Sequence, residues 1–270
     1  MKCCICGTVR NCGKYLEKVF SNIEKIGSIF DDYVIIVYYD KSNDNTLDFL
    51  KEYKTKNSRL VFYVNNEPLS NYRTHRISKG RNMSLNMARN QYTDYEYFIM
   101  MDFDDINAKE MDLEVLKSKL SLETWDALSF VNVTEHYYYY DIWALSIQPF
   151  VVSFRHFKNY LSVSDKMHHF IDKKLKETPK EELIPCASAF GGFSIYRIDK
   201  FVNCNYSGKL RIELIPKQLI KNNLLAVNTP LSFTNSEGSI NEDCEHKSFH
   251  LEAILKNNAR IRISPEKLFY

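Results

Sequence analysis

The feature that most constrains the fold is a regular alternation of two hydrophobic patterns through the first 105 residues. Short apolar runs predict buried strands, and the segments between them carry apolar residues at the three- and four-residue spacing of a helix. The predicted strands are 3–8, 33–39, 60–64 and 96–102, and the predicted helices are 13–28, 44–54 and 76–91. Short loops join these elements, as in units where a helix returns the chain to a neighbouring parallel strand. We therefore predict an α/β protein with a doubly wound, mostly parallel sheet.

Beyond residue 105 the alternation is less regular. The remaining patterns predict strands at 126–133 and 259–263, a glycine-broken strand at 187–196, a half-buried strand at Tyr137–Tyr140, a helix at 243–256, and a polar helix or a mobile excursion at 155–178. A shift in composition near residue 130 separates two halves, 1–130 and 131–270. We expect one continuous sheet to contain both halves, rather than two independent domains.

Bulk composition excludes several classes of protein. The 36 basic and 34 acidic residues nearly cancel, so bulk charge gives no reason to expect a nucleic-acid partner. No run reaches the roughly 18 apolar residues of a membrane span. The apolar stretch at the N-terminus ends at Arg10 and Asn11 and is too short for a signal peptide. The seven cysteines are odd in number and crowded toward residues 3–12, which indicates reduced thiols. We therefore expect a soluble, cytoplasmic protein without a transmembrane segment.

An acidic cluster follows the predicted strand at 96–102. Asp102, Asp104 and Asp105 stand where that strand ends, and parallel α/β sheets bind ligands at the carboxyl ends of their strands. Two carboxylates at positions i and i+2 can converge on one Mn²⁺ or Mg²⁺ ion, with diphosphate oxygens completing its shell. The alternative is an acidic loop that caps the next helix.

Two polar segments upstream favour the ligand-binding interpretation. The run Asp40–Thr46 follows the second predicted strand, and its acidic and hydroxyl side chains can accept hydrogen bonds from a base or a ribose. Arg73, Arg76 and Arg81 begin the helix that precedes the acidic strand, and guanidinium groups bind diphosphates as bidentate donors. The alternatives are an ordinary turn with Asp44 as a helix cap and a solvated basic helix face.

A third constellation opens the predicted helix at 243–256. Glu242, His246 and His250 are spaced four apart and therefore share one helix face. A histidine here can complete a metal shell, and Glu242, Asp243 or Glu245 can deprotonate an acceptor hydroxyl in an inverting reaction. The alternative is a capped helix with a polar face.

Together these motifs resemble the glycosyltransferases of the GT-A fold. The order of strands, the Asp-x-Ser-x-Asp-x-Thr loop, the Arg-x-x-x-x-Arg-Asn helix and the Asp-x-Asp-Asp cluster is similar to the opening of that fold. Segments at Arg76–Asn82, Asp102–Asp104, Tyr140–Leu145 and Gly191–Phe193 are similar to those of fungal capsule-associated mannosyltransferases and of glycosyltransferases from large DNA viruses. Ser146 departs from this pattern, because those enzymes have an arginine after the Trp-Ala-Leu segment. The details of the acceptor site therefore do not follow from the resemblance.

The resemblance implies a fold, a reaction and a set of roles. The fold is a GT-A, Rossmann-like three-layer sandwich with a mixed, mostly parallel central sheet, in which 1–130 binds the nucleotide sugar and 131–270 binds the acceptor. The reaction moves a sugar from a UDP- or GDP-sugar to a hydroxyl of a glycan or glycoprotein, with Mn²⁺ or Mg²⁺ assisting, in the host cytoplasm if the protein is viral. The expected nucleotide-sugar ligands are Thr8, Arg10, Asp40, Arg76, Arg81, Asn82 and Asp102; the expected metal ligands are Asp102, Asp104, His246 and His250.

An acceptor platform is expected from aromatic and glycine residues. Sugars stack on aromatic rings and glycine lets a ligand approach the backbone, so Trp143 and the run Gly191, Gly192 and Phe193 are candidates. Core packing with a bulge is the alternative for each.

Missing motifs and rival functions complete the prediction. The chain has neither a G-x-x-x-x-G-K-[ST] loop nor a G-x-G-x-x-G turn after its first strand, which argues against P-loop and dinucleotide-binding enzymes. The rivals are a sugar nucleotidyltransferase, for which the segment Gly7–Asn11 is too poor in glycine, and a non-catalytic carbohydrate-binding module on the same fold.

Overall fold

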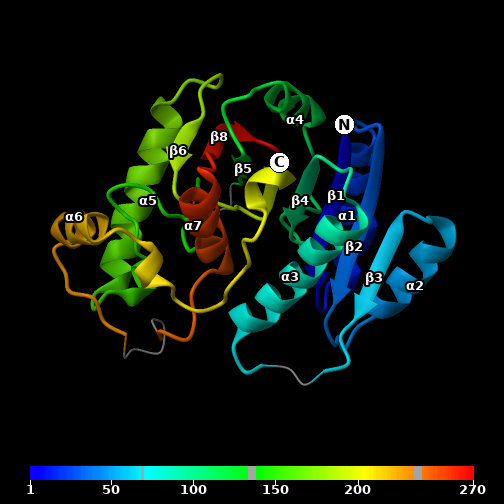
Figure 1. Cartoon of the computed structure of the whole chain (residues 1–270), viewed down its shortest axis with the longest axis horizontal. Coiled ribbons are helices and arrows are strands. Elements are labelled where there is room, and N and C mark those ends of the chain that lie inside the picture. Colours follow the sequence, from blue (N-terminus) through cyan, green and yellow to red (C-terminus); the bar gives the residue numbers. More distant parts are fainter. Residues whose placement is uncertain (68–69, 133–137, 234–238) are drawn as a thin grey trace.

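One eight-stranded sheet forms the centre of the molecule, with the strand order β3-β2-β1-β4-β7-β5-β8-β6 (Figure 1). The computed structural model describes residues 1–67, 70–132, 138–233 and 239–270. The strands are β1 (Lys2–Val9), β2 (Asp32–Tyr39), β3 (Leu60–Val64), β4 (Tyr97–Met101), β5 (Ala127–Val131), β6 (Ile184–Cys186), β7 (Phe193–Arg197) and β8 (Ile261–Lys267). Strands β6 and β7 run antiparallel to their neighbours, and the other pairings are parallel.

Helices cover both faces of the sheet, because side chains of each strand alternate between them. They are α1 (Gly13–Gly27), α2 (Thr46–Lys56), α3 (Arg73–Gln91), α4 (Leu113–Leu120), α5 (Tyr160–Glu177), α6 (Lys217–Val227) and α7 (Glu245–Asn257). In β1, Cys3 and Ile5 pack in the core shared with α1, α2 and α4, whereas Cys4 and Cys6 pack in the core shared with α3 and α7. The predicted three-layer α/β architecture is thereby confirmed.

The first half follows its sequence pattern closely. Leu16, Val19, Phe20, Ile23 and Ile26 recur at helical spacing, and all five are buried on the inner side of α1. The strands β1 to β4 pair in parallel through these helical connections, as expected for right-handed βαβ units. All seven cysteines are free thiols, and burial raises the pKa of those in β1 above the usual value.

The second half departs from the pattern at several points. The sequence did not predict α4, α6 or β6. Tyr138 and Tyr139 form a bend and Tyr140 has no regular structure, where a strand was predicted; Tyr137 lies outside the described residues. Strand β8 continues through Pro265, which the prediction placed after its end. This is tolerated because the pairing of β8 with β5 becomes irregular at Phe130 and Val131, so a missing backbone N–H does not interrupt a regular ladder.

Strand β7 joins the two halves into one sheet. It comes from the second half of the chain and lies between β4 and β5. It therefore places the segment around Gly191 and Gly192 beside the end of β4. The division at residue 130 stays a prediction. In the described parts of the chain, no helix is both long and apolar enough to cross a bilayer.

Close packing of α3 on the sheet depends on Gly80. A Cβ atom at this position would lie 2.6 Å from Thr8 Cγ2 and 2.6 Å from the Tyr38 ring. We expect Gly80→Val to destabilise the protein by about 1–3 kcal/mol, the usual cost of overpacking, as measured by urea unfolding. Asn86→Val is the matched control, because Asn86 is exposed on the same helix. Equal stability of the two variants would contradict this packing.

Candidate active site

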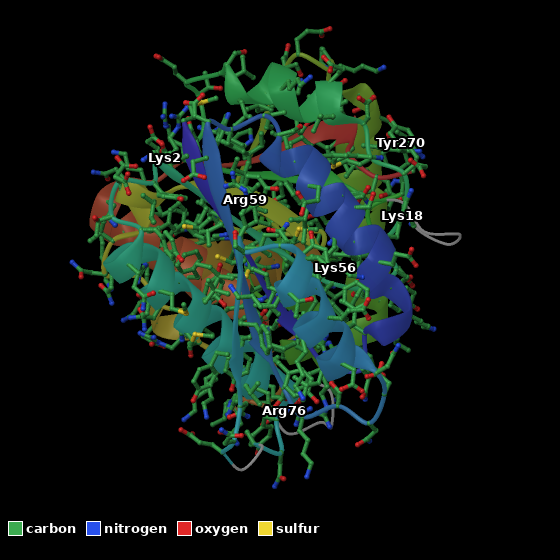
Figure 2. The ribbon with its side chains drawn as sticks, turned by 90° about the vertical axis from the view of Figure 1, so that its right-hand side faces the viewer. Lys2, Lys18, Lys56, Arg59, Arg76 and Tyr270 are labelled. Atoms are coloured by element: carbon green, nitrogen blue, oxygen red, sulfur yellow. The ribbon has the colours of Figure 1, made fainter. Side chains whose placement is uncertain are left out.

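A cavity of about 350 Å³ opens at the carboxyl ends of β1, β2 and β4. In Figure 2, Arg76 marks this end of the molecule, opposite Lys2 at the start of β1. Of the residues expected to bind the nucleotide sugar or metal, those that line the cavity are Thr8, Arg10, Asp40, Arg76, Asp102 and Asp104; Arg73 and Tyr38 line it as well. The fold therefore brings together side chains from three strand ends and one helix, as parallel sheets do.

Strand β2 contributes Asp40, the residue that follows it, to the lining of the cavity. Its side chain accepts a hydrogen bond from Asn65 Nδ2 at 3.1 Å, and Arg76 Nε lies 4.0 Å from its other oxygen. Asp44 has a structural role instead, because it accepts hydrogen bonds from Gly13 N and from Thr46. The loop after β2 is therefore held in place by Asp44 while Asp40 faces the cavity.

Strand β4 contributes Asp102 and Asp104, which follow its last residue, to the lining of the cavity. Burial raises the pKa of Asp104 to about 7, and the negative charge of Asp102 adds to this shift. Burial also raises the pKa of Asp102, against the opposing effect of Arg81. Two neighbouring carboxylates whose charges repel each other, in a cavity of about 350 Å³, fit a divalent cation that would relieve their repulsion.

Arg81 lies behind this acidic pair and does not line the cavity. Its guanidinium donates to Asp102 Oδ1 at 2.8 Å and lies 2.6 Å from Glu245 Oε1, and the Phe190 ring packs 4.5 Å from its central carbon. Arg81 and Glu245 are both buried, so this ion pair is shielded from solvent. The geometry makes Arg81 a residue that positions Asp102, whereas the sequence predicted that it contacts the ligand directly.

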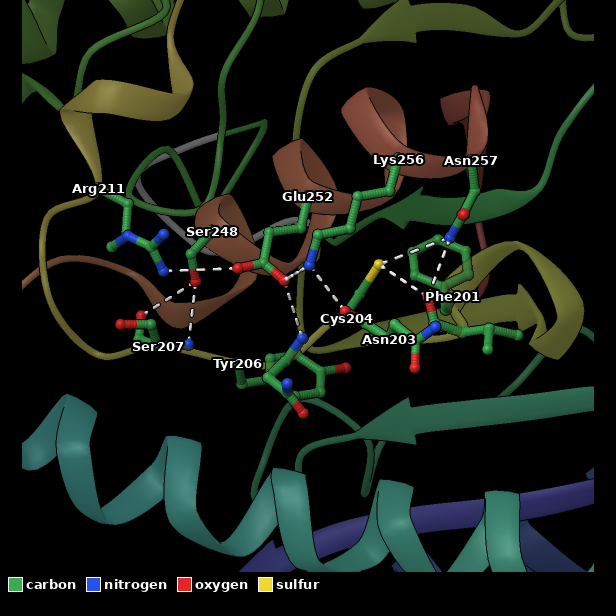
Figure 3. A network of polar contacts seen from close by, with 12 residues as sticks. Phe201, Asn203, Cys204, Tyr206, Ser207, Arg211, Ser248, Glu252, Lys256 and Asn257 are labelled. Carbon is green, nitrogen blue, oxygen red and sulfur yellow. Dashed lines mark hydrogen bonds and ion pairs between the residues drawn. The ribbon is translucent and has the colours of Figure 1, made fainter.

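Asn82 also serves the framework. Its side chain donates to Tyr206 O at 2.9 Å and accepts from Tyr206 N at 2.8 Å, which fixes α3 to the loop between β7 and α6. Figure 3 shows how that loop is attached in turn to α7: Ser207 N donates to Ser248 Oγ at 2.9 Å. Helix α3 and helix α7 are thus held in register, which keeps Arg81 opposite Glu245.

The two histidines of α7 are the clearest correction to the sequence prediction. His250 is fully buried, and its two ring nitrogens hydrogen-bond with Ser188 Oγ at 3.0 Å and Tyr196 OH at 3.1 Å. His246 stacks on Phe190 with ring centroids 3.7 Å apart, and burial holds its pKa well below the usual value. Within the described residues, no three His, Cys, Asp or Glu side chains could hold a metal ion together. The two histidines therefore pack in the core. Their spacing in the sequence predicted correctly that they share one face of the helix, but it could not predict which residues that face contacts.

The three acids proposed from sequence as catalytic have separate surroundings. Glu242 Oε1 accepts from Thr74 Oγ1 at 3.2 Å, near the start of α3. Burial raises the pKa of Asp243, but Lys247 and His156 outweigh it, so the net pKa is below the usual value. Glu245 forms the ion pair with Arg81. None of the three lines the cavity at the ends of β1, β2 and β4.

The expected acceptor platform is divided between turn and core. Gly191 and Gly192 have φ values of +66° and +83°, so glycine is needed at both positions. Phe193 is fully buried between other aromatic rings and offers no face to a sugar. Trp143 is half-buried, and Arg155 lies 3.7 Å from its ring centroid. Among these residues, only the glycine turn adjoins the acidic pair, since Asp102 N donates to Gly192 O at 2.8 Å.

Sequence reasoning did not single out Asp141. Its carboxyl group accepts hydrogen bonds from Ala144 N at 3.1 Å and Gly191 N at 3.3 Å. Its place in the Tyr-Asp-x-Trp segment was the only signal in the sequence. That signal did not predict the contact between Asp141 and the glycine turn.

A mostly parallel sheet with one inserted antiparallel strand, carrying paired aspartates at a strand end beside a cavity, defines the class of GT-A glycosyltransferase folds. The family model of glycosyl transferase family 2 matches residues 4–201, and the chain belongs to this family. No curated protein matches the chain.

Solved structures agree with this fold. The crystal structure of S. aureus TarS 1-349 has a TM-score of 0.51 and 17% identity, covering 100% of this chain and 60% of that chain. The same TarS fragment in complex with UDP-GlcNAc has a TM-score of 0.50 and 16% identity, covering 100% of this chain and 58% of that chain. The chain thus spans about 60% of the length of these solved chains.

Proposed function

We propose that this protein transfers a sugar from a UDP- or GDP-sugar to a hydroxyl group of a glycan or glycoprotein. The observation that carries the proposal is the set of residues that line one cavity: Asp40 after β2, Asp102 and Asp104 after β4, and Arg73 and Arg76 from α3. Strand β1 lies between β2 and β4 in the sheet, so we assign Asp40 to the base and ribose, and Asp102 and Asp104 to the diphosphate and sugar.

The arginines and carboxylates have complementary tasks in this proposal. Arg73 and Arg76 donate charge-assisted hydrogen bonds to the diphosphate oxygens. Asp102 and Asp104 hold Mn²⁺ or Mg²⁺, with the diphosphate and water supplying the remaining ligands. When bound, the cation offsets the negative charge that develops on the leaving nucleoside diphosphate. Arg81 keeps Asp102 in place from behind, as the 2.8 Å contact indicates.

The finer assignments are also proposals. Likeness to fungal capsule-associated mannosyltransferases and to glycosyltransferases of large DNA viruses is supported by the short segments at Arg76–Asn82 and Tyr140–Leu145. A cytoplasmic location is supported by the crowded free cysteines. UDP-GlcNAc is the first donor to test, because the TarS fragment binds it.

A thermal-shift experiment tests the donor and the metal together. With Mn²⁺ present and a donor at about 100 times its Kd, binding stabilises the folded state by about 2.7 kcal/mol, which raises Tm by roughly 5 °C or more. The panel contains UDP-GlcNAc, other UDP-sugars and GDP-sugars, each with and without Mn²⁺. We expect one donor to raise Tm only when metal is present.

Three other results would contradict this proposal. Stabilisation that is equal with and without metal would remove the role of Asp102 and Asp104 as a cation site. Pyrophosphate release from a nucleoside triphosphate would indicate a nucleotidyltransferase. Binding of a carbohydrate without turnover of any donor would indicate a binding module.

A further inference from the structure

We propose that Asn107 positions the two carboxylates of the cation site, because it ties the loop that carries Asp102 and Asp104 to the glycine turn. The inference rests on the proposed function, in which Asp102 and Asp104 hold Mn²⁺ or Mg²⁺. Asn107 lies in the segment between β4 and α4, five residues after Asp102. Its side chain is fully buried and does not line the cavity, so its effect on a cation passes through other residues.

The side-chain amide of Asn107 holds two backbone carbonyl groups. Its Nδ2 donates to Asp102 O at 2.7 Å and to Gly192 O at 2.7 Å. Gly192 O also accepts a hydrogen bond from Asp102 N at 2.8 Å. The glycine turn is therefore joined to the end of β4 through both the N–H and the C=O group of Asp102.

Asparagine is the residue type that fits these two contacts. Only the NH₂ end of an amide can lie between two carbonyl oxygens, because the other end is an acceptor. An aspartate would place an acceptor against both carbonyls, and a serine would supply a single donor. The two hydrogen bonds are also shielded from water, since the Asn107 side chain is fully buried.

The loop that begins at Asp102 presents Asp104 to the cavity. Asp104 O accepts from Ala108 N at 3.1 Å, and Asp104 Oδ1 accepts from Ile106 N at 3.1 Å. In the described part of the chain, Asp104 Oδ2 accepts no hydrogen bond, so this oxygen is available to a cation. Asp102 and Asp104 carry like charges that repel each other, and a loop held at both residues keeps their carboxylates at the cavity in spite of this repulsion.

The backbone of Asn107 is held independently of its side chain. A Cβ atom at Gly192 would lie 3.2 Å from Ile106 Cγ2 and 3.7 Å from Asn107 Nδ2, so the glycine turn packs directly on this loop. Asn22 of α1 donates to Asn107 O at 2.8 Å and to Lys109 O at 2.8 Å. The bonds from Asn22 remain when the side chain of Asn107 is shortened. Such a variant removes the two contacts of the amide and leaves the loop attached to α1.

The affinity for Mn²⁺ tests the positioning role. Free Mn²⁺ gives a sharp electron paramagnetic resonance signal that is lost on binding, so a titration in the presence of UDP or GDP gives the Kd of the ion. Residues that orient metal ligands typically contribute about 10- to 100-fold to metal affinity. We expect Asn107→Ala to weaken Mn²⁺ binding by about this factor, because the two carboxylates are kept but no longer held in place.

Asn223→Ala is the matched control. Asn223 is also fully buried, and its Oδ1 accepts hydrogen bonds from two backbone groups, Val151 N at 3.0 Å and Val152 N at 2.8 Å. It lies on α6 and does not line the cavity. Its variant should lose stability in urea much as Asn107→Ala does, and should bind Mn²⁺ with the affinity of the unaltered protein.

Each other result decides the assignment. Unchanged Mn²⁺ affinity in Asn107→Ala would overturn the positioning role, and so would equal weakening in Asn223→Ala, which would trace the effect to lost stability. If Asn107→Ala does not fold, Asn107→Ser replaces it; weaker Mn²⁺ binding supports the role and normal binding overturns it. Absence of Mn²⁺ binding by the unaltered protein would overturn the cation site of the proposed function itself, and this is observed before any variant is compared.

Discussion

Asp104→Ala is expected to lower donor turnover by about 100- to 1,000-fold, the loss typical when a preorganised group that stabilises transition-state charge is removed. The variant should also lose its response to Mn²⁺, because one of the two carboxylates at the end of β4 is gone. Stability should not fall. The pKa of Asp104 is raised to about 7 by burial and by Asp102, so its ionised form is a burden on the fold in the absence of a cation. Initial rates with varied Mn²⁺ and a thermal melt measure both effects.

Asp105→Ala provides the control for this variant. Asp105 is the next residue in the chain and also carries a carboxylate, but it is exposed and does not line the cavity. Its loss should change neither turnover nor metal dependence. If Asp104→Ala kept normal turnover with the same metal dependence, the assignment of the cation site would be wrong.

Arg81→Ala is expected to have the largest effect on stability. Its guanidinium is buried between Asp102 and Glu245, at 2.8 Å and 2.6 Å. Removing one partner of a buried ion pair leaves uncompensated charge in the interior, which costs about 3–5 kcal/mol. Arg81→Lys should recover only part of this loss, because an ammonium group cannot reproduce the planar contacts with both acids. Urea unfolding with a fitted slope measures the difference.

Lys79→Ala is the matched control on the same helix. Lys79 pairs with Glu67 at the surface, with both side chains largely exposed, and such pairs contribute about 0–1 kcal/mol. A double variant, Arg81→Met with Glu245→Met, should be more stable than Arg81→Ala, because it no longer buries the Glu245 charge. An Arg81→Ala protein as stable as Lys79→Ala would show that the buried ion pair is not part of the framework.

The strand ends of the first half were predictable from sequence. Asp40 and Asp102 each follow an apolar run, and parallel strands place such residues at one edge of a sheet. The structure confirms the elements and brings both residues to one cavity. No long-range information was needed, because each step from strand to helix to strand is local and has a fixed hand.

The roles of Arg81, His246 and His250 were not predictable in the same way. Spacing by four residues shows that His246 and His250 share a helix face, yet their partners Phe190, Ser188 and Tyr196 lie far away in the chain. Arg81 likewise meets Glu245 only because α3 packs near α7. The sequence shows which residues carry a charge, but the packing of helices and strands determines which residue each charge pairs with.

The sequence by itself determined the α/β sheet, the carboxylates at its strand ends and the chemistry those carboxylates favour, since hydrophobic period and residue type are local properties. Only the tertiary structure decided which polar residues face the cavity and which instead make contacts that connect helices and loops. That choice depends on contacts between distant segments, such as the turn at Gly191 and Gly192 that brings Asp141 beside the end of β4. Burial against those segments determines whether a side chain binds a ligand or packs in the core.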